Sequence, residues 1–485
     1  MSFAAVLARG CTAAALVGFG LLIPGDSAWG ASWRVDPYVE LSETYTNNIT
    51  LRSGGQKEGE FVTQINPGLA VTADGRNLDL LFFYRLQNLF YLNVPGRNNS
   101  YQQLLGRFDS SLVRNFLFLD GEAAYRQMVI DPEDDIGQGN ISIVGGRQNL
   151  ATTRLSPYIR KKLGRWSLVE LRYGYDAMNF LGGSAYSSLS RTFSGRLVDA
   201  TPADRWRWAI GFSSRNVDYV SGGGTLGQAP SEEMWRYIDY ALDYGFNRKL
   251  VLNGKIGYED NKFLGQSGSL EPQGVYWNLG VTWQPTPRSA FVIGRGQRYF
   301  GPNWNLDLSR KGRRSLLGLS YVHDVTTRRR SLLEIPLFDS DGNPIVDPDT
   351  SEQVTGRVPV QGVYIRQRAQ MWAEYGTRKS RFLLSYYREL SDYQSQDRKE
   401  EVSGGSLGWR TRLSRRTTFL LTMRGEDTDA IGRYRDRLRI SKASLKHDLS
   451  RKTQASVDLR RTRRERSRSA DYVETLLTAR IVVRW

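Results

Sequence analysis

Hydrophobic and polar residues alternate along most of this chain with a period of two. In one segment, Trp206, Trp208 and Ile210 interleave with Arg205 and Arg207. The same alternation recurs in the segments 78–86, 275–283, 363–371 and 407–413. Successive side chains of an extended strand point to opposite faces, so each segment has one apolar face and one polar face. The pattern predicts β-strands, and no long helical period competes with it.

Short polar turns, usually carrying Arg or Lys, separate these strands in pairs. Two of them, 413–417 and 449–453, nearly repeat each other. Successive turns lie about 40 residues apart, which is the length of two strands of roughly 12 residues plus a longer loop. The turns are expected at residues 74–77, 114–115, 164–165, 202–204, 247–249, 285–288, 326–328, 376–380, 414–417 and 450–453. They predict eleven hairpins, or about 22 strands within a range of roughly 18 to 26.

The first residues have the order of parts of a secretory signal peptide. Arg9 precedes an uncharged stretch, 10–25, and Ala28 and Gly30 supply the small side chains of a cleavage site. We therefore expect residues 1–31 to be a cleaved signal peptide and residues 32–485 to form a single domain. No later apolar run is long enough for a transmembrane helix. A closed sheet is the only other structure that satisfies its backbone hydrogen bonds in lipid. The expected fold class is therefore all-β, a transmembrane antiparallel β-barrel in the outer membrane of a Gram-negative cell envelope.

Aromatic residues are abundant, with 12 Trp, 25 Tyr and 19 Phe. Tryptophans that alternate with polar residues along a strand are typical of the girdles at membrane interfaces. The tryptophans expected there are Trp206, Trp208, Trp277, Trp283 and Trp409. The chain ends at Trp485, with Leu477, Ile481 and Val483 on the same face. This end resembles the last strand of outer-membrane barrels, whose terminal aromatic residue is read by the barrel assembly machinery. A secreted, soluble sheet is the alternative, and the placement of the tryptophans argues against it.

The chain is strongly basic, because 67 Lys and Arg against 50 Asp and Glu leave a net charge of +17. The phase of the alternation directs a set of arginines toward the lumen. Arginine stays charged and its planar donor fork suits carboxylate, sulfate or phosphate, so a ring of arginines would concentrate anions. For any single arginine, pairing with a neighbouring carboxylate or contact with lipopolysaccharide is the alternative. The inward arginines are expected to be Arg154, Arg160, Arg172, Arg205, Arg207, Arg366, Arg368, Arg410, Arg412, Arg439, Arg460 and Arg480.

A barrel of about 22 strands is roughly 45 Å across, and an open hole of that width would be harmful. The first strand, near 38–46, begins close to the expected mature terminus, so no plug domain is expected. Inward-folded loops, flattening of the barrel or a periplasmic partner must then close the pore. The longer connections, expected on the outer side of the cell, are 131–148, 220–231, 339–359 and 391–401.

Few residues offer catalytic chemistry. Cys11, the single cysteine, lies in the signal segment. The two histidines, His323 and His447, each precede an aspartate and are expected at the edge formed by the short turns. An outer-membrane hydrolase needs a histidine near the outer rim, where its substrate arrives. We therefore expect no enzyme and no cofactor.

Three sequence motifs that indicate a binding site in other proteins do not indicate one in this chain. The glycine-rich segment 222–227 lacks the strand–turn–helix context of a dinucleotide site. The segment 339–343 begins like a calcium loop, but Pro344 and Thr350 replace the glycine and glutamate of that loop. A helix-flanked metal site is therefore excluded, and only a surface cation between loops stays open. The basic run 460–466 suggests nucleic acid, which the export signal argues against.

Four short segments, 43–49, 65–68, 156–158 and 335–344, resemble a known family. They read ETYTNNI, INPG, SPY and IPLFDSDGNP. The family comprises outer-membrane β-barrels associated with PEP-CTERM protein-sorting systems and exopolysaccharide production. The similarity extends over nearly the whole mature chain and implies a role in polysaccharide secretion. One departure is that Asn47 follows Thr46 where an Asp–Asn pair is expected.

These observations lead to one main expectation and one alternative. The main expectation is an outer-membrane channel that exports an anionic exopolysaccharide through an arginine-lined lumen. Its partners would be outer-membrane lipid, lipopolysaccharide, the barrel assembly machinery, the anionic polysaccharide and a periplasmic secretion partner, without nucleic acid. The alternative is a barrel that anchors polysaccharide or lipopolysaccharide through its outer loops and transports nothing.

Overall fold

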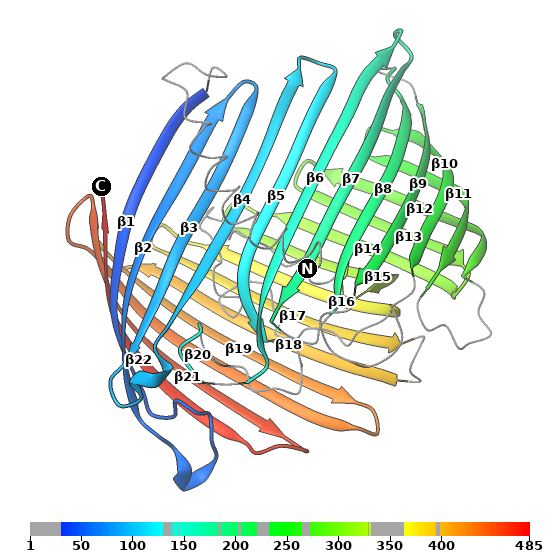
Figure 1. Cartoon of the computed structure of the whole chain (residues 1–485). Coiled ribbons are helices and arrows are strands. Elements are labelled where there is room, and N and C mark those ends of the chain that lie inside the picture. The colour runs from blue at the N-terminus through cyan, green and yellow to red at the C-terminus, as the bar shows by residue number, and fades with distance from the viewer. Residues whose placement is uncertain are drawn as a thin grey trace.

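The chain folds into one closed antiparallel sheet. The computed structural model describes residues 31–129, 137, 139–143, 145–182, 186–201, 205–220, 232–263, 272–327, 329–330, 363–393 and 398–485. These form a 22-stranded sheet. It closes because β1 (Ala31–Thr46) pairs with β22 (Tyr472–Arg484) (Figure 1). The predicted barrel is therefore confirmed. The expected signal peptide lies outside the described residues except for Ala31, which begins β1.

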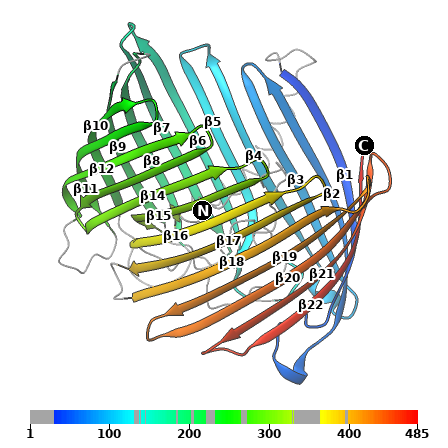
Figure 2. The ribbon, with the colours of Figure 1, turned by 180° about the vertical axis from the view of Figure 1, so that it is seen from behind.

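Each strand pairs with the next one in the sequence, which gives an up-and-down meander. The strands between β1 and β22 are β2 (Glu60–Gly75), β3 (Leu78–Tyr91), β4 (Asn99–Val113), β5 (Leu117–Val129), β6 (Arg147–Leu163), β7 (Ser167–Leu181), β8 (Ser187–Asp199), β9 (Trp206–Val220), β10 (Glu233–Asn247), β11 (Leu250–Lys262), β12 (Gln273–Thr286), β13 (Ser289–Arg298), β14 (Gly301–Lys311), β15 (Ser315–Thr327), β16 (Val363–Gly376), β17 (Ser380–Tyr393), β18 (Arg398–Arg412), β19 (Thr417–Ala430), β20 (Tyr434–Asp448) and β21 (Thr453–Arg466). Two short 3-10 helices, η2 (Gly54–Gln56) and η3 (Pro95–Arg97), interrupt the first loops. Among the described residues, no helix is long and apolar enough to cross a membrane. Figure 2 shows that the strands of the near wall cross those of the far wall at an angle, as strand tilt in a barrel requires.

Short turns join each even-numbered strand to the following odd-numbered strand at one end of the barrel. Every one of these turns includes an exposed basic residue. These are Arg76, Arg114, Arg165, Arg205, Arg248, Arg288, Arg313, Arg378, Arg415 and Arg451. Close to this rim, Trp166 in a turn and the outward-facing Trp206 and Trp283 are about half exposed. The guanidinium of Arg165 lies over the Trp166 ring at 4.6 Å.

One predicted turn is wrong. Residue Thr326 lies within β15, and the turn that follows β14 is at residues 312–314. The Gly312 amide donates to the Ser315 carbonyl at 2.7 Å and closes this turn. Consecutive arginines occur at 313–314 and again at 328–330, so basic character alone did not separate a turn from a strand end. As a consequence, His323 lies toward the longer loops, whereas His447 does lie beside a short turn, 2.9 Å from the Thr417 hydroxyl.

The long connections are shorter than predicted at two places. β17 runs to Tyr393 and β18 begins at Arg398, so most of the predicted loop 391–401 is strand. Val220 likewise still belongs to β9. The predicted loop 339–359 lies outside the described residues.

The register distinguishes the two faces of the wall, because directly paired residues share a face. Glu40 pairs with Asn66, and both are buried on the inner face. Their neighbours Leu41 and Ile65 are 48% and 44% exposed on the outer face. Following the pairing around the barrel places every one of the predicted girdle tryptophans on the outer face, together with Leu477, Ile481 and Val483. The amide of Trp485 donates to the Pro37 carbonyl at 3.1 Å.

Candidate functional site in the barrel lumen

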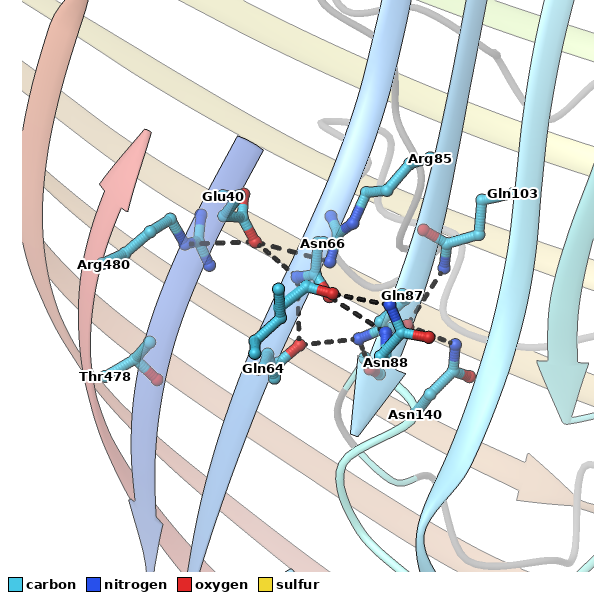
Figure 3. Close-up of polar contacts among 12 residues, drawn as sticks. Glu40, Gln64, Asn66, Arg85, Gln87, Asn88, Gln103, Asn140, Thr478 and Arg480 are labelled. Carbon is cyan, nitrogen blue, oxygen red and sulfur yellow. Dashed lines mark hydrogen bonds and ion pairs between the residues drawn. The ribbon is translucent and has the colours of Figure 1, made fainter. Parts of the chain in front are cut away.

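A carboxylate between two guanidinium groups marks the place where the barrel closes. Glu40 of β1 is only 7% exposed. Its Oε1 lies 3.6 Å from Arg85 Nη2 of β3 and 3.7 Å from Arg480 Nε of β22. Asn66 Nδ2 donates to the same oxygen at 2.9 Å. Figure 3 shows these side chains gathered on the inner wall. Two cations share one carboxylate here, so the closure site keeps an excess of positive charge.

A ladder of side-chain amides continues from Asn66 across the inner wall. Gln87 Nε2 donates to Gln64 Oε1 at 2.9 Å, and Gln103 Nε2 donates to Gln87 Oε1 at 3.4 Å. Gln64, Gln87 and Gln103 are all at least 95% buried (Figure 3). The Oε1 of Gln103 has no hydrogen-bond partner. An amide both donates and accepts, so this ladder matches the chemistry of uncharged hydroxyl groups.

Parts of two long connections fold against the inner wall. From the β5–β6 connection, Asn140 Nδ2 donates to Gln87 Oε1 and Ser142 Oγ donates to Glu474 Oε1, both at 2.9 Å. Ile141 packs in a buried apolar cluster with Ile49, Val62, Leu89, Tyr91 and Leu476. An inward-folded loop was one of the three devices expected to narrow the pore, and residues 139–143 provide one.

Arg329, from the β15–β16 connection, also reaches the inner wall. Its Nε donates to Ser188 Oγ and its Nη2 to the Asp176 carbonyl, each at 2.9 Å. Burial lowers the pKa of this guanidinium, with the charge of Asp176 acting against the shift. The contact joins the wall at β7–β8 to a segment that precedes β16.

Most of the predicted inward arginines do face the lumen, and half of the twelve are neutralised there by carboxylates. Pairing of side chains across the wall gives Arg154–Asp176 at 2.8 Å, Arg160–Glu170 at 2.6 Å, Arg172–Asp120 at 2.8 Å, Arg207–Asp243 at 3.5 Å, Arg366–Asp324 at 3.0 Å and Arg368–Glu389 at 3.1 Å. Arg205 lies at the short-turn rim just before β9, and Arg410 lies opposite Arg381 on the inner face. Positive net charge is therefore not spread evenly around the lumen.

The inward placement of Arg439 is wrong. Arg439 pairs in register with Gly425 on the outer face, and its Nη2 lies 2.9 Å from Asp427 Oδ2. Leu438 and Ile440, its apolar neighbours, are the buried inner-face residues. The usual polarity is inverted here because the ends of β19–β21 near the longer loops carry ion pairs on the outside. The alternation remains, but apolar residues no longer mark the outer face.

Several basic residues lie close together on the inner wall of β19–β21. Arg460 is 9% exposed, and its Nε and Nη2 have no hydrogen-bond partner. Its direct partner across the sheet is Lys442, another cation. Arg424 on β19 also has unpartnered Nε and Nη2 atoms, as has the hydroxyl of Ser444, which is 1% exposed. We call Arg424, Lys442, Ser444 and Arg460 the basic cluster. Toward the short turns, Arg412 and Lys446 extend this basic wall.

Sequence reasoning found Arg460 and Arg480 but missed several neighbours. Glu40, Arg85, Arg424 and Lys442 were not singled out, and neither was the amide ladder. No signal in a single strand could have shown the ladder, because it depends on register between strands. The like-charged pair of Lys442 and Arg460 could have been found by aligning the nearly identical turns that flank β19 and β20.

No family model matches this chain, and no curated protein matches it. Among solved structures, a variant of the ferric enterobactin receptor PfeA from Pseudomonas aeruginosa, in complex with enterobactin, is 9% identical. The match covers 94% of this chain and 82% of that one, with a TM-score of 0.53. The FrpB iron transporter from Neisseria meningitidis (F3-3 variant) is 10% identical over 93% of this chain and 81% of that one, with a TM-score of 0.53. At such low identity these likenesses show the fold alone, which is that of an outer-membrane β-barrel.

Proposed function

We propose that this chain is a channel in the outer membrane of a Gram-negative cell through which an anionic exopolysaccharide leaves the cell. The observation that carries the proposal is that two parts of the inner wall differ in their side-chain chemistry. Side-chain amides lie on the inner face of β2–β4, and on β19–β21 the buried Arg424 and Arg460 keep guanidinium nitrogens without a hydrogen-bond partner.

The chemistry of such a polymer fits both surfaces. A polysaccharide presents many hydroxyl groups, which side-chain amides match as donors and acceptors. Gln64, Gln87 and Gln103 are buried and hydrogen-bonded to one another and to Asn140, so they would contact the polymer only if Asn140 moved away. Acidic sugars or acidic substituents add carboxylate, sulfate or phosphate groups, which arginine recognises with charge-assisted hydrogen bonds. A small neutral solute would offer no charged group for these cations to bind.

Two further points support a transport role. Barrels of about 22 strands that move solutes hold material inside the lumen, and residues 139–143 fold inward here. The solved structures with this fold include an iron transporter and a receptor in complex with enterobactin. The resemblance to barrels associated with PEP-CTERM systems supports polysaccharide as the cargo class.

The proposed surroundings follow from the outer face. Girdle tryptophans such as Trp206 and Trp277 would contact membrane lipid. The terminal strand, with Leu477, Ile481, Val483 and Trp485, would be read by the barrel assembly machinery. Charged outer-face residues near the longer loops, such as Arg437 and Arg439, would meet lipopolysaccharide. A periplasmic partner would deliver the polymer to the rim formed by the short turns.

The outer ion pairs of β19–β21 favour a second candidate, a barrel that anchors surface polymer without transport. Deletion of the gene separates the two functions. If the chain is an exporter, the polymer accumulates in the periplasm of the deletion strain. If the polymer is released at normal levels but is retained poorly at the cell surface, the chain is an anchor and the export proposal is wrong.

A further inference from the structure

The rim formed by the short turns carries most of the positive charge of the chain. By sequence, the ten short turns hold 15 Arg and Lys residues and one acid, Asp204. All 15 basic side chains are exposed. Within the part of the chain that the structure describes, none of them forms an ion pair. The net charge of +17 is therefore concentrated at one end of the barrel.

Acids at the adjoining strand ends have uncharged partners instead. Asp199 Oδ1 accepts from the Thr201 hydroxyl at 2.6 Å. Asp448 Oδ1 accepts from Gln454 Nε2 at 2.9 Å. The carboxylates closest in sequence to these turns thus leave the turn cations without a counterion from the protein.

At the other end of the barrel, exposed cations of the outer face do have carboxylate partners. Arg388 Nε lies 2.7 Å from Glu401 Oε1 on the neighbouring strand. Arg435 Nε lies 2.9 Å from Asp429 Oδ2. Exposed cations are therefore neutralised near the longer loops and left unpaired at the short turns. An end that keeps its cations unpaired fits an anionic surface outside the protein.

Bulky apolar side chains lie in the same turns as the cations. Phe116, Trp166, Leu413 and Leu449 are between 40% and 60% exposed. Each of them lies within two residues of an arginine. The headgroup region of a membrane offers phosphate to a cation and hydrocarbon to an apolar side chain at nearly the same depth. A turn that exposes both kinds of side chain fits that region better than it fits a purely aqueous partner.

The basic turns surround the whole barrel. Turn 76–77 follows β2, and turn 312–314 follows β14, which is twelve strands farther along a closed sheet of 22. One folded protein partner would cover a sector of this rim, whereas lipid headgroups surround a barrel on every side. The turns are only two to six residues long, so they stay close to the membrane. These observations favour lipid over an acidic protein.

We propose that the short-turn rim binds the phosphate groups of anionic phospholipids in the leaflet that it faces. The Arg and Lys side chains donate charge-assisted hydrogen bonds to the phosphates, and the neighbouring apolar side chains contact the upper part of the acyl chains. A basic residue near an anionic membrane surface strengthens binding by about fivefold. The inference goes beyond the proposed function, because it needs only a barrel in a membrane and holds whether or not a polymer passes through it.

The test counts the phospholipids that the full-length protein, purified in a neutral detergent, retains from an equimolar mixture. The mixture contains phosphatidylglycerol, which is anionic, and phosphatidylcholine, whose phosphate is offset by its own cation. Native mass spectrometry in ammonium acetate at about 0.15 M measures the ratio, since charges farther apart than about 8 Å are then largely screened. The natural chain should retain phosphatidylglycerol over phosphatidylcholine by about fivefold or more. Equal retention of the two lipids overturns the proposal.

Two matched variants change the ten turn arginines named under the overall fold, one in each turn. Arg→Gln at all ten positions should lower the ratio to less than about twofold, because the charges are lost. Arg→Lys at the same positions keeps the charges and should leave the ratio within about twofold of the natural value. Far-UV circular dichroism verifies that both variants are folded. A ratio that survives Arg→Gln overturns the proposal.

A third variant keeps every cation and removes the apolar side chains. Replacing Phe116, Trp166, Leu413 and Leu449 by Ser should lower the retained phosphatidylglycerol by about threefold or more. Unchanged retention would mean that the rim acts through charge alone, as an acidic protein would require, and the lipid proposal would be wrong.

Competition separates the lipid from soluble anions. Glycerol 3-phosphate has the phosphate without acyl chains, and oligogalacturonate is an acidic oligosaccharide. Neither should displace phosphatidylglycerol from the natural chain at equal concentration. Displacement by glycerol 3-phosphate would identify free phosphate as the ligand, displacement by oligogalacturonate would identify an acidic polymer, and either result would overturn the proposal.

Discussion

Two parts of the inner wall use the same type of residue in opposite ways. On β5–β7, Arg154, Arg160 and Arg172 each lie within 2.8 Å of a carboxylate oxygen. On β19–β21, Arg460 lies opposite Lys442 and keeps nitrogens without a partner. The paired wall is internally neutralised and needs nothing from the lumen. The comparison teaches that the supply of a carboxylate by the neighbouring strand, and not the presence of arginine, distinguishes a neutralised wall from one that keeps unpartnered guanidinium nitrogens.

Breaking the most buried ion pair should give the largest effect. Arg464→Gln removes the cation that donates to both carboxylate oxygens of Asp436, which is 7% exposed. The free energy of unfolding should fall by about 3 to 5 kcal/mol, as for other buried pairs that lose one partner. Urea unfolding, followed by tryptophan fluorescence in detergent, measures the loss. Adding Asp436→Asn should restore most of it, and a double variant as unstable as the single one would show that packing rather than charge holds Arg464.

Adding a carboxylate to β19 should make the basic wall of β19–β21 resemble the neutralised wall of β5–β7. Thr422 on the inner face of β19 pairs directly with Lys442, so Thr422→Glu places an acid beside the basic cluster. The free energy of unfolding should rise by about 1 to 2 kcal/mol, because the added carboxylate offsets the repulsion between the like charges of Lys442 and Arg460. Urea unfolding in detergent measures the gain. Thr422→Gln, which has the same shape without the charge, serves as the control and should not raise it.

Ion selectivity should separate the two walls without affecting the fold. Replacing Arg412 and Lys446 by Gln removes unneutralised charge from the basic wall and should shift the reversal potential in a planar bilayer toward cation preference. The matched double variant Arg160→Gln with Glu170→Gln removes an ion pair of zero net charge, so the reversal potential should stay where it is. An equal shift in both variants would remove the distinction between the walls.

The smallest effect is expected on the outer face. Arg439 and Asp427, both more than 40% exposed in their side chains, form an ion pair that water and salt screen. Arg439→Gln should change the free energy of unfolding by less than about 1 kcal/mol, and less still at high salt. Because Arg439 faces away from the lumen, the reversal potential should not respond. A clear change in the reversal potential would mean that Arg439 faces the lumen.

Alternation was enough to predict the barrel because it depends only on neighbouring residues in one strand. The strand number, the repeated short turns and the outer-face tryptophans followed from the same local signal. Arg439 was misplaced because the rule "apolar faces lipid" holds only within the membrane, and β20 continues beyond the zone where it applies. The misplaced turn at Thr326 has a similar cause, since Arg-rich segments occur both in turns and at strand ends.

The functional wall could not be read from single strands. Whether Arg366 or Arg460 is neutralised depends on which residue the next strand brings opposite, Asp324 for the first and Lys442 for the second. The amide ladder of Gln64, Gln87 and Gln103 likewise exists only once three strands are in register. Contacts such as Ser142 with Glu474 join segments that are far apart in the sequence, and no periodic pattern announces them.

The ring is completed by its first and last strands, with Glu40 beside Val482 and Thr44 beside Thr478. All other strand pairs join sequence neighbours, so they can assemble hairpin by hairpin as the polypeptide arrives. Until the final strand pairs with the first, the growing sheet has two edge strands whose unpaired backbone groups can hydrogen-bond to any extended peptide. An interrupted chain would therefore yield no smaller barrel. It would yield an open sheet that aggregates with other copies through its edge strands. Incomplete chains would then reach cellular quality control as aggregates and not as leaky pores.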